Sequence, residues 1–466
     1  MDTKIKSIIV FRRLLSYSKY VAMVSTWFIL ISGSLANAQN KNLTDSLQYF
    51  NLDQCIVYAL THQPEIMQAS LNLAIAKKTN SINLSAWLPQ VTLQGNFTHY
   101  LQQPTIFAVN TADPGGPPVQ VHSGVVNTFN PQISASQTIF SPEVFYAAKT
   151  AHLYVQQALQ SDDSTKINLV ATVSKSFYNV LFTQEQIRIL KDDTVRLGKN
   201  LRDAYHQYIG GIVDKTDYKE AFISLNNSRA QLKQASESLR PQYSALKQSM
   251  GFPPEKEFNV QFDTLQMMKE VAIDTTLQIQ YDKRIEYQLL QTAKDLQQQD
   301  IKYQRWQFIP TASALYNYTY EFENNTLSNI FNKAYPNSFI GASLSIPIFT
   351  GWRRKASIER SKLQLQKIDW AEFGLKSRIF TEYTTAMANY RSNLADLKVL
   401  QDNVVMAKDV YGVVSLQYKQ GVVAYLNVIT AESNLFSSEI SYINSLFKVL
   451  LSKVDLEKAM GVLSKY

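Results

Sequence analysis

The chain has very little of the chemistry that enzymes and metal proteins use. Its 466 residues include one cysteine, Cys55, and five histidines that are scattered along the sequence. A single cysteine cannot form an internal disulfide. The chain also lacks Cys-x-x-Cys, His-Glu-x-x-His, Gly-x-x-x-x-Gly-Lys-Ser/Thr and Gly-x-Ser-x-Gly sequences. We therefore expect no catalytic residues, no metal site, no cofactor and no enzymatic activity.

Long apolar runs are also scarce. The clearest one, Val21 to Ile31, lies near the N-terminus, after a cluster of basic residues and before Ala36-Asn37-Ala38. This order predicts a secretory signal peptide over residues 1–38, cut after Ala38. Cys55 does not follow the cleavage site, so a lipid on an N-terminal cysteine is not expected. Beyond residue 38 no apolar run reaches the ~18–20 residues that a transmembrane helix needs.

A strong excess of charge of one sign is missing from the mature chain. The signal peptide carries five of the 46 basic residues and one of the 38 acidic residues. Its removal leaves 41 basic against 37 acidic residues, a net charge of about +4. Such a weak excess does not favour nucleic acid as a partner.

One long stretch contains no proline. Trp352 to Tyr418 spans 67 residues with only two glycines, Gly374 and Gly412. As an unbroken helix it would reach roughly 100 Å. Apolar or small residues recur in it alternately three and four positions apart, a mean spacing of about 3.5 that is typical of a left-handed coiled-coil seam. The seam positions are Ile379, Tyr383, Ala386, Tyr390, Leu397, Leu400, Val404, Ala407, Tyr411, Val414 and Tyr418, with Asn393 as the one strongly polar member.

The same pattern occurs a second time, 210 positions earlier in the chain. The stretch from Pro142 to Tyr208 is again 67 residues long and keeps apolar, small or hydroxyl residues at the equivalent positions. Further identical residues recur at the same spacing of 210 positions, and they are Gly211 with Gly421, Leu225 with Leu435 and Met250 with Met460. Pro89 and Pro310 recur at a spacing of 221. The sequence therefore predicts two copies of one supersecondary unit.

Alternating stretches lie between the predicted helices. From Val91 to Leu101 apolar residues alternate with polar ones, and the same period of two recurs near 132–140, 312–322 and 340–348. The third of these stretches carries Tyr316, Tyr318, Tyr320 and Phe322 on one side, as an aromatic girdle would. Residues 102–128, rich in proline and glycine, and residues 323–337 are predicted loops.

These patterns divide the mature chain into two repeats and a linker. The first repeat, 39–251, has a helix, a β-hairpin at about 89–140, a long helix at 142–208 and a return helix that Pro241 is expected to break or kink. Residues 252–276 are the linker, with little pattern. The second repeat, 277–466, has a helix, a hairpin at about 310–349, a long helix at 352–418 and a return helix. The predicted fold class is mainly α, with four β-strands per chain.

The predicted strands have the two faces of membrane-spanning strands. A strand of about ten residues with one apolar and one polar side fits lipid outside and water inside. An ordinary sheet packed on a protein core is the alternative, but helices of roughly 100 Å are too long to cover a compact sheet. Four strands cannot close a barrel, so closure has to be shared between chains. Two chains would give about eight strands and a filled barrel, and three would give about twelve and room for water.

Taken together, these residues resemble the TolC-type outer-membrane efflux proteins. The order that carries the resemblance is helix, Leu88-Pro89 strand, hairpin, Phe140-Ser141-Pro142 long helix and Tyr208-x-x-Gly211 turn, repeated through Pro310, Ile348-Phe349-Thr350-Gly351 and Tyr418-x-x-Gly421. The resemblance covers the chain from about Leu52 to Leu463. It implies a homotrimer with a twelve-stranded β-barrel in outer-membrane lipid of a Gram-negative bacterium and a helical α-barrel that extends into the periplasm. It also implies a tip that docks a periplasmic membrane-fusion adaptor and, through it, an inner-membrane transporter.

The resemblance places a gate near the two turns. Tyr418 falls where a gate tyrosine sits, and Asp217 falls on the aspartate that bonds to it. Asn427 and Thr430 stand where the best-known members have two pore-ringing aspartates, and Val423 replaces an expected arginine. Cation selectivity at the constriction is therefore not implied for this chain. The alternatives are that Tyr418 is an ordinary seam residue and Asp217 a solvated helix residue.

The two turns are the predicted adaptor-docking surface. They carry apolar residues that a lone chain would expose, and their sequences are Gly210-Gly211-Ile212-Val213 and Gly421-Val422-Val423-Ala424. Simple capping of the preceding helices by glycine is the alternative role.

The function that these expectations favour is a passive exit duct for small toxic molecules in a tripartite efflux system. The energy has to come from the partner pump, because the chain has no nucleotide-binding motif. Two alternatives remain open. One is the outlet of a type I protein secretion system, and the other is a trimeric coiled-coil structural or adhesive protein with soluble hairpins. The cargo, the partner pump and adaptor, and the resting state of the gate are not specified by the sequence.

Overall fold

The computed structural model describes residues 48–109, 115–261, 271, 273 and 278–463. The chain forms two units, Met1–Gln48 and Tyr49–Tyr466, and all described residues except Gln48 belong to the second. The expected signal peptide, 1–38, lies outside the described residues.

The described residues of the first half of the chain form four α-helices. They are α2 (Leu52–His62), α3 (Pro64–Ser85), α4 (Pro142–Ile209) and α5 (Lys215–Met250). A capping box begins α2, where Asn51 Oδ1 accepts a hydrogen bond from the Gln54 amide at 2.8 Å and Gln54 Oε1 accepts one from the Asn51 amide at 3.0 Å. Both α3 and α4 have proline in the first turn, where its missing N–H leaves no helical bond unmade.

Pro241 does not break α5. The helix continues through it to Met250, whereas the sequence pattern predicted a break or kink there. Proline in a helix interior removes one N–H donor and crowds the carbonyl of the preceding turn. Leu239 and Tyr243, on either side of Pro241, both pack against the main apolar core, and this packing holds the helix together across the proline.

The second half repeats the arrangement. It contains the 3-10 turn η1 (Tyr281–Lys283) and the helices α7 (Ile285–Trp306), α8 (Arg353–Lys419) and α9 (Tyr425–Met460). The sequence pattern placed the start of the first of these helices near residue 277, and α7 begins later, at Ile285. Within α8 the predicted seam residues Ile379, Ala386, Tyr390, Leu397 and Tyr418 are buried.

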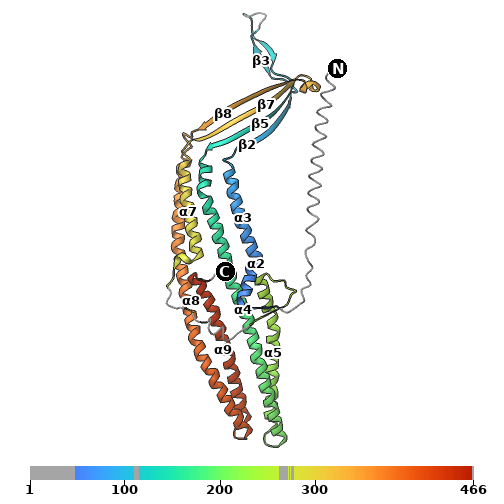
Figure 1. The fold of residues 1–466 in the computed structure, drawn as a ribbon, viewed down its shortest axis with the longest axis vertical. Helices are drawn as coiled ribbons and strands as arrows, with labels where there is room; N and C mark the ends of the chain where they lie inside the picture. Colours follow the sequence, from blue (N-terminus) through green and yellow to red (C-terminus); the bar gives the residue numbers. More distant parts are fainter. Residues whose placement is uncertain (1–47, 110–114, 262–270, 272, 274–277, 464–466) are drawn as a thin grey trace. The chain divides into compact units, whose positions relative to one another are not determined.

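The strands from both halves join in a single antiparallel sheet. Its members are β2 (Gln90–His99), β5 (Asn127–Phe140), β7 (Thr311–Asn324) and β8 (Ala334–Ser345), in the order β2-β5-β7-β8 (Figure 1). The helices connected to them pack in the same order, α3 on α4, α4 on α7 and α7 on α8. The strands and helices at the two ends of this arrangement are therefore consecutive in the chain, α3 with β2 and β8 with α8.

Three features of the hairpins differ from the sequence expectation. The predicted loop 102–128 contains a small hairpin, β3 (Thr105–Ala108) paired with β4 (Val119–His122). The predicted loop 323–337 contains the 3-10 helix η2 (Leu327–Asn332) and the start of β8. The final strand ends at Ser345 rather than continuing toward Phe349. The prolines and glycines around β3 and β4 interrupt the alternation of apolar and polar residues, so strands of four residues are not detected from a period of two.

The linker also contains structure that the pattern did not predict. β6 (Phe258–Val260) forms a two-stranded sheet with β1 (Gln48–Phe50). The Phe50 and Phe258 rings meet edge to face with their centroids 5.3 Å apart. Further along, the buried Tyr390 hydroxyl of α8 donates to the Val271 carbonyl oxygen at 2.7 Å, which ties the linker to the long helix. Residues 262–270, 272 and 274–277 of the linker lie outside the described residues.

The main apolar core lies where α2, α4, α5, α8 and α9 meet. Its fully buried members include Val173 and Leu181 of α4, Leu246 of α5, Tyr390 of α8 and Leu450 of α9. Two smaller apolar clusters continue along the helices toward the two turns. One is built on Ile187, Leu190 and Ala235, and the other on Ala204, Ala221, Tyr418, Tyr425 and Val428.

The return helices of both halves end in the same way. Gly251 after α5 and Gly461 after α9 adopt the left-handed conformation, with φ of 67° and 70°. A Cβ built on Gly251 would lie 2.8 Å from the His62 carbonyl oxygen, and one on Gly461 would lie 2.8 Å from the Lys283 carbonyl oxygen. Each glycine therefore allows the end of a return helix to touch the backbone at the start of its own half, a contact that any side chain would prevent.

This contact predicts an unusual cost for Gly251→Ala. The left-handed conformation alone costs a residue with a Cβ about 1–2 kcal/mol, and the clash with the His62 carbonyl adds to it, so we expect a total loss of about 3 kcal/mol in the free energy of unfolding. Gly211→Ala is the matched control, because φ is 71° there and nothing lies within 4 Å of the added Cβ. Urea unfolding midpoints of the two variants test the difference, and equal losses would contradict the close packing at Gly251.

Candidate functional site

The four-stranded sheet has one apolar and one polar face. The register places Val91, Ala135, Tyr316 and Ile340 in one row across all four strands. The neighbouring row, on the opposite face, contains Thr92, Ser134 and Asn317, with Phe339 as its one apolar member. The next rows keep the alternation, because Leu93 pairs with Ile133 and Gln94 pairs with Gln132. Two-faced strands were predicted from the sequence, and the register shows that their apolar sides coincide.

The apolar face is exposed in the single chain. The Leu93 side chain is 74% exposed and that of Ile340 is 82% exposed. Both belong to end strands of the sheet, since β2 and β8 have a partner on one side only in the sheet order. The sheet therefore presents an uncovered apolar face and two backbone edges with free hydrogen-bonding groups.

Two negative findings concern the described ranges only. No helix there is both long enough and apolar enough to cross a membrane. The same residues contain no group of three or more His, Cys, Asp or Glu side chains placed to hold a metal ion.

The two turns expose apolar side chains, as the sequence suggested. Gly211 and Gly421 adopt the left-handed conformation with φ of 71° and 73°, so each terminates its long helix. Directly after them, Ile212 is 69% exposed and Val422 is 67% exposed. Capping and exposure therefore coexist at both turns. Gly210 of the first turn keeps a right-handed conformation, and Val213 and Val423 pack partly against the cluster around Tyr418.

Tyr418 and Asp217 do not form the expected hydrogen bond in this structure. Tyr418 is 4% exposed, its ring lies 5.2 Å from that of Tyr425, and its hydroxyl is buried without a hydrogen-bond partner. Burial, together with the nearby charges of Asp217 and Asp203, raises the pKa of Tyr418 to about 12. Burial and the carboxylates of Glu220 and Asp214 raise the pKa of Asp217. The two groups are thus near enough to interact electrostatically, but the direct bond is absent.

Asn427 and Thr430 lie on the exposed side of the first turns of α9. The Thr430 hydroxyl donates to the Leu426 carbonyl oxygen of its own helix at 2.9 Å, and the Asn427 backbone N–H donates to the Ala424 carbonyl oxygen at 3.1 Å. These contacts do not tie α9 to another helix, so the role of both residues in a constriction stays a prediction.

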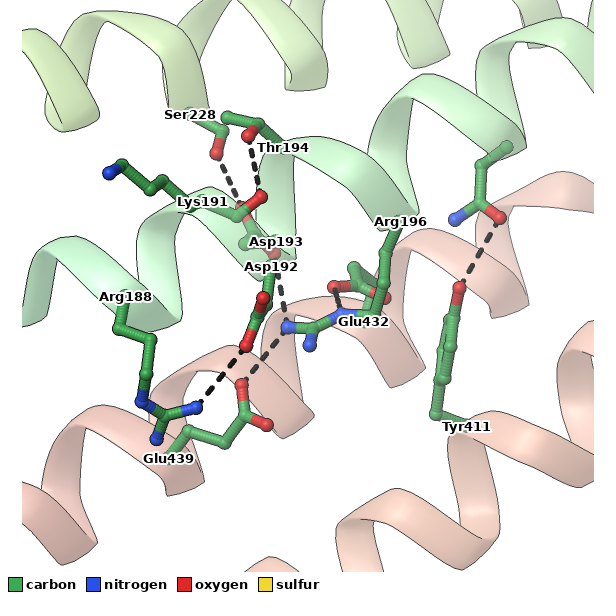
Figure 2. Close-up of polar contacts among 11 residues, drawn as sticks. Arg188, Lys191, Asp192, Asp193, Thr194, Arg196, Ser228, Tyr411, Glu432 and Glu439 are labelled. Atoms are coloured by element: carbon green, nitrogen blue, oxygen red, sulfur yellow. Dashed lines mark hydrogen bonds and ion pairs between the residues drawn. The ribbon is translucent and has the colours of Figure 1, made fainter. Parts of the chain in front are cut away.

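A polar cluster that the sequence did not reveal connects α4 with α9. Arg196 of α4 donates through Nε to Glu432 Oε1 at 2.8 Å and through Nη2 to Glu439 Oε2 at 3.0 Å (Figure 2). The same guanidinium lies 3.5 Å from the Asp193 carboxylate. Ser228 of α5 donates to the other Asp193 oxygen at 2.5 Å. One partly exposed cation, with its side chain 21% exposed, therefore contacts three carboxylates on two helices.

The contacts continue from Arg196 along one face of α4 toward the turns. The Tyr411 hydroxyl of α8 donates to Asn200 Oδ1 at 3.3 Å (Figure 2), and Lys419 of α8 lies 3.8 Å from the Asp203 carboxylate. Gln207 Nε2 donates to the Tyr418 carbonyl oxygen at 3.4 Å. The α4 residues in these contacts, spaced three or four apart, are Asp193, Arg196, Asn200, Asp203 and Gln207. We call this face of α4, with its partners on α8 and α9, the polar joint.

The polar joint is incompletely satisfied. Nine buried side-chain polar atoms in the part of the chain that the structure describes lack a hydrogen-bond partner. Five of them lie at or beside the polar joint: Asn200 Nδ2, Gln207 Oε1, Tyr418 Oη, Tyr425 Oη and Glu432 Oε2. A buried polar atom without a partner costs about 1–3 kcal/mol. The joint therefore contributes less stability than its number of contacts suggests.

Glu432 is the group in the polar joint whose protonation changes near neutral pH. It is 2% exposed, and this burial, together with a hydrogen bond to Asp193, raises its pKa to about 7 although Arg196 opposes the shift. The titratable groups that face it are Asp193 and Arg196 on α4, Tyr411 on α8 and Tyr425 on its own helix. Protonation of Glu432 would remove one of the crowded negative charges beside Asp193.

A sequence signal for the polar joint exists, but it is ambiguous. Polar residues at positions 193, 196, 200, 203 and 207 follow the same alternation of three and four as an apolar seam. On a single helix this pattern is also what a solvated face shows. Only the position of α9 over that face distinguishes a joint from a surface.

The raised pKa predicts how stability depends on pH. The folded state holds the Glu432 proton more tightly than the unfolded chain, so this contribution is complete below about pH 4 and is lost as pH rises to about 7. Between pH 4.5 and 7.5 the wild type should lose about 2–3 kcal/mol more than Glu432→Gln, which keeps the hydrogen bonds without the charge. Denaturant unfolding at the two pH values measures this difference. Glu185→Gln, at an ion pair within α4, should behave as wild type, and a Glu432→Gln variant with the wild-type pH dependence would exclude this assignment.

Comparisons with known proteins agree with this arrangement. The family model described as outer membrane efflux protein matches residues 55–252 and 288–462. Outer membrane protein TolC of Vibrio cholerae is 18% identical, over 89% of this chain and 91% of that protein. The probable efflux pump outer membrane protein TtgC of Pseudomonas putida is 22% identical, over 89% of this chain and 84% of that protein.

A solved structure supports the fold. The crystal structure of the outer membrane protein VceC from Vibrio cholerae superposes with a TM-score of 0.70 at 15% identity, covering 88% of this chain and 96% of that one. The two matched segments of the family model include both long helices and most of both halves. The chain therefore belongs to the outer membrane efflux protein family.

Proposed function

We propose that three copies of this chain form a passive exit duct that carries small toxic molecules across the outer membrane, driven by a partner pump. The observation that carries the proposal is the four-stranded sheet, with its exposed apolar face and two open edges. Members of the family are channels. We infer that this chain likewise has no enzymatic activity of its own.

The sheet edges support closure between copies. Along the sheet the strands alternate in direction, so β8 at one edge runs opposite to β2 at the other. A second copy can therefore add its β2 to β8 as a further antiparallel neighbour. Repeated around a ring, this contact leaves no edge, and three copies give about twelve strands, enough for a water-filled interior.

The outermost helices have matching uncovered surfaces. α3 exposes Ile75 and Ile82, and α8 exposes Trp370 and Phe373. These helices lie at opposite ends of the packing order α3-α4-α7-α8 and adjoin the two edge strands in the chain. Burying both surfaces against neighbouring copies continues the same contact from the sheet into the helices, since large exposed apolar surfaces favour association.

The turn residues support partners at the far end of the helices. Ile212 lies in the turn between α4 and α5, Val422 lies in the turn between α8 and α9, and both expose apolar side chains. We propose that they dock the periplasmic adaptor, which connects the duct to an inner-membrane transporter. The toluene efflux pump outer membrane protein TtgC of Pseudomonas putida is 22% identical over 89% of this chain, and its name supports small toxic molecules as the cargo. Asp217, Tyr418, Asn427 and Thr430 remain the proposed gate residues of the narrow end, with Tyr418 buried beside it rather than lining it.

Channel activity tests the proposal directly. Protein extracted from outer membranes should migrate as a heat-resistant trimer, and it should produce discrete single-channel currents in planar lipid bilayers. Both results follow because the sheet can close only between copies. A soluble trimer that carries no current would contradict the duct and favour a structural coiled-coil protein.

The two faces of β2 allow a sharper test of the membrane orientation. Leu93→Arg places a charge on the apolar face and should cost about 2–4 kcal/mol in the membrane, so few trimers should reach the outer membrane. Gln94→Arg, one residue further on the polar face, is the matched control and should assemble normally. Trimers counted in outer-membrane fractions give the measurement. Equal assembly of both variants would show that the apolar face does not contact lipid.

A further inference from the structure

We propose that Arg196, with Glu432 and Glu439, is the latch that holds the α8/α9 helix pair against the α4/α5 pair and so restricts the proposed duct. This inference rests on the proposed function. It assigns the restraint to a salt-bridged site between α4 and α9, rather than to the contact between Tyr418 and Asp217.

The position of Arg196 fits a latch. The main apolar core joins α4 to α9 farther from the turns, through residues such as Val173 and Leu450. A smaller cluster around Tyr418 joins all four helices close to the turns. Between these apolar clusters the Arg196 ion pairs are the direct polar connection of α4 to α9 among the described residues. A restraint at this point controls whether the helix ends can move apart while the main core stays intact.

Arg196 is the central partner of the site. It contacts Glu432 and Glu439 one on each side, and Asp193 also lies within ion-pair distance. Without the guanidinium, two carboxylates of α9 would face a third on α4 with no cation between them. Loss of this one side chain therefore removes the cation that attracts the two helices and leaves the crowded acidic groups without a partner of opposite charge.

The remaining contacts of the polar joint are weaker. Lys419 Nζ lies 3.8 Å from the Asp203 carboxylate, and Gln207 Nε2 lies 3.4 Å from the Tyr418 carbonyl oxygen. The Tyr418 and Tyr425 hydroxyls are buried without partners, so parting of the helices would expose them to water and relieve that cost. The joint near the turns is thus poised to open once the Arg196 contacts are lost.

Tyr418 contributes packing rather than a bond to Asp217. Its hydroxyl has no hydrogen-bond partner, whereas its ring packs on Tyr425. Removing the hydroxyl alone leaves this packing unchanged. Tyr418→Phe therefore separates the two assignments of the latch.

Single-channel recording in planar bilayers tests the inference on full-length trimers. Arg196→Met keeps the apolar stem and removes the charge. Losing a hydrogen-bonded charge pair should raise the ratio of wide to narrow conductance states about tenfold. Glu439→Gln, which disturbs only the less buried arm, should shift the ratio in the same direction by a smaller factor and keeps the test valid if Arg196→Met does not assemble. Tyr418→Phe should leave this ratio unchanged or lower it, because it removes a buried hydroxyl that gains water only when the helices part.

Arg188→Met is the matched control. Arg188 lies on the same helix, and both of its ion pairs, to Glu185 and Asp192, stay within α4. Figure 2 shows the pair with Asp192. Glu439 of α9 acts on Arg188 only through its charge, so the loss of Arg188 breaks no ion pair between the helices. If Arg196→Met and Glu439→Gln record like Arg188→Met while the wild type conducts, the latch is wrong and the duct stands. If Tyr418→Phe opens the channel and Arg196→Met does not, the restraint belongs to Tyr418. A wild type that carries no current overturns the proposed function itself.

Discussion

The arrangement depends on one condition that a single chain cannot meet, which is the pairing of every backbone group in a sheet exposed to lipid. β2 and β8 each leave one side unpaired, and in a membrane every such group costs several kcal/mol. Because α3 runs into β2 and β8 leads into α8, in the proposed trimer the neighbour that pairs the strands also meets the exposed apolar sides of these helices. Backbone hydrogen bonds between edge strands in lipid and burial of apolar helix surface in water thus both favour the same proposed contact between copies.

Most of the fold could be predicted because its elements repeat one simple period over a great length. The seam of α8 from Ile379 to Tyr418 and the two-faced strand after Val91 each follow a single rule of side-chain geometry. Prediction failed where a partner distant in the sequence decides the outcome. β1 pairs with β6 across most of the first half, and Leu239 and Tyr243 hold α5 together through Pro241.

The candidate site shows the same division at the level of single residues. The motif around Tyr418 located the residue correctly at the end of the seam, but it could not predict that the hydroxyl would be enclosed beside Tyr425 rather than bonded to Asp217. Arg196 has no motif at all. Its role depends on Glu432 and Glu439 of the other half, and their distance from it in the sequence carries no signal.

A polar joint suits a wall that has to open better than an apolar joint does. Exposing apolar surface to water costs about 25 cal/mol of free energy per Å², and no new interaction with water compensates this cost. A buried ion pair adds little net stability, because water solvates both charges when they separate. The contact of Arg196 with Glu432 and Glu439 can therefore fix one alignment of the helices at little net stability. Opening at the boundary between the α4/α5 and α8/α9 pairs therefore has to separate the Arg196 contacts and the small apolar cluster around Tyr418, but not the main apolar core.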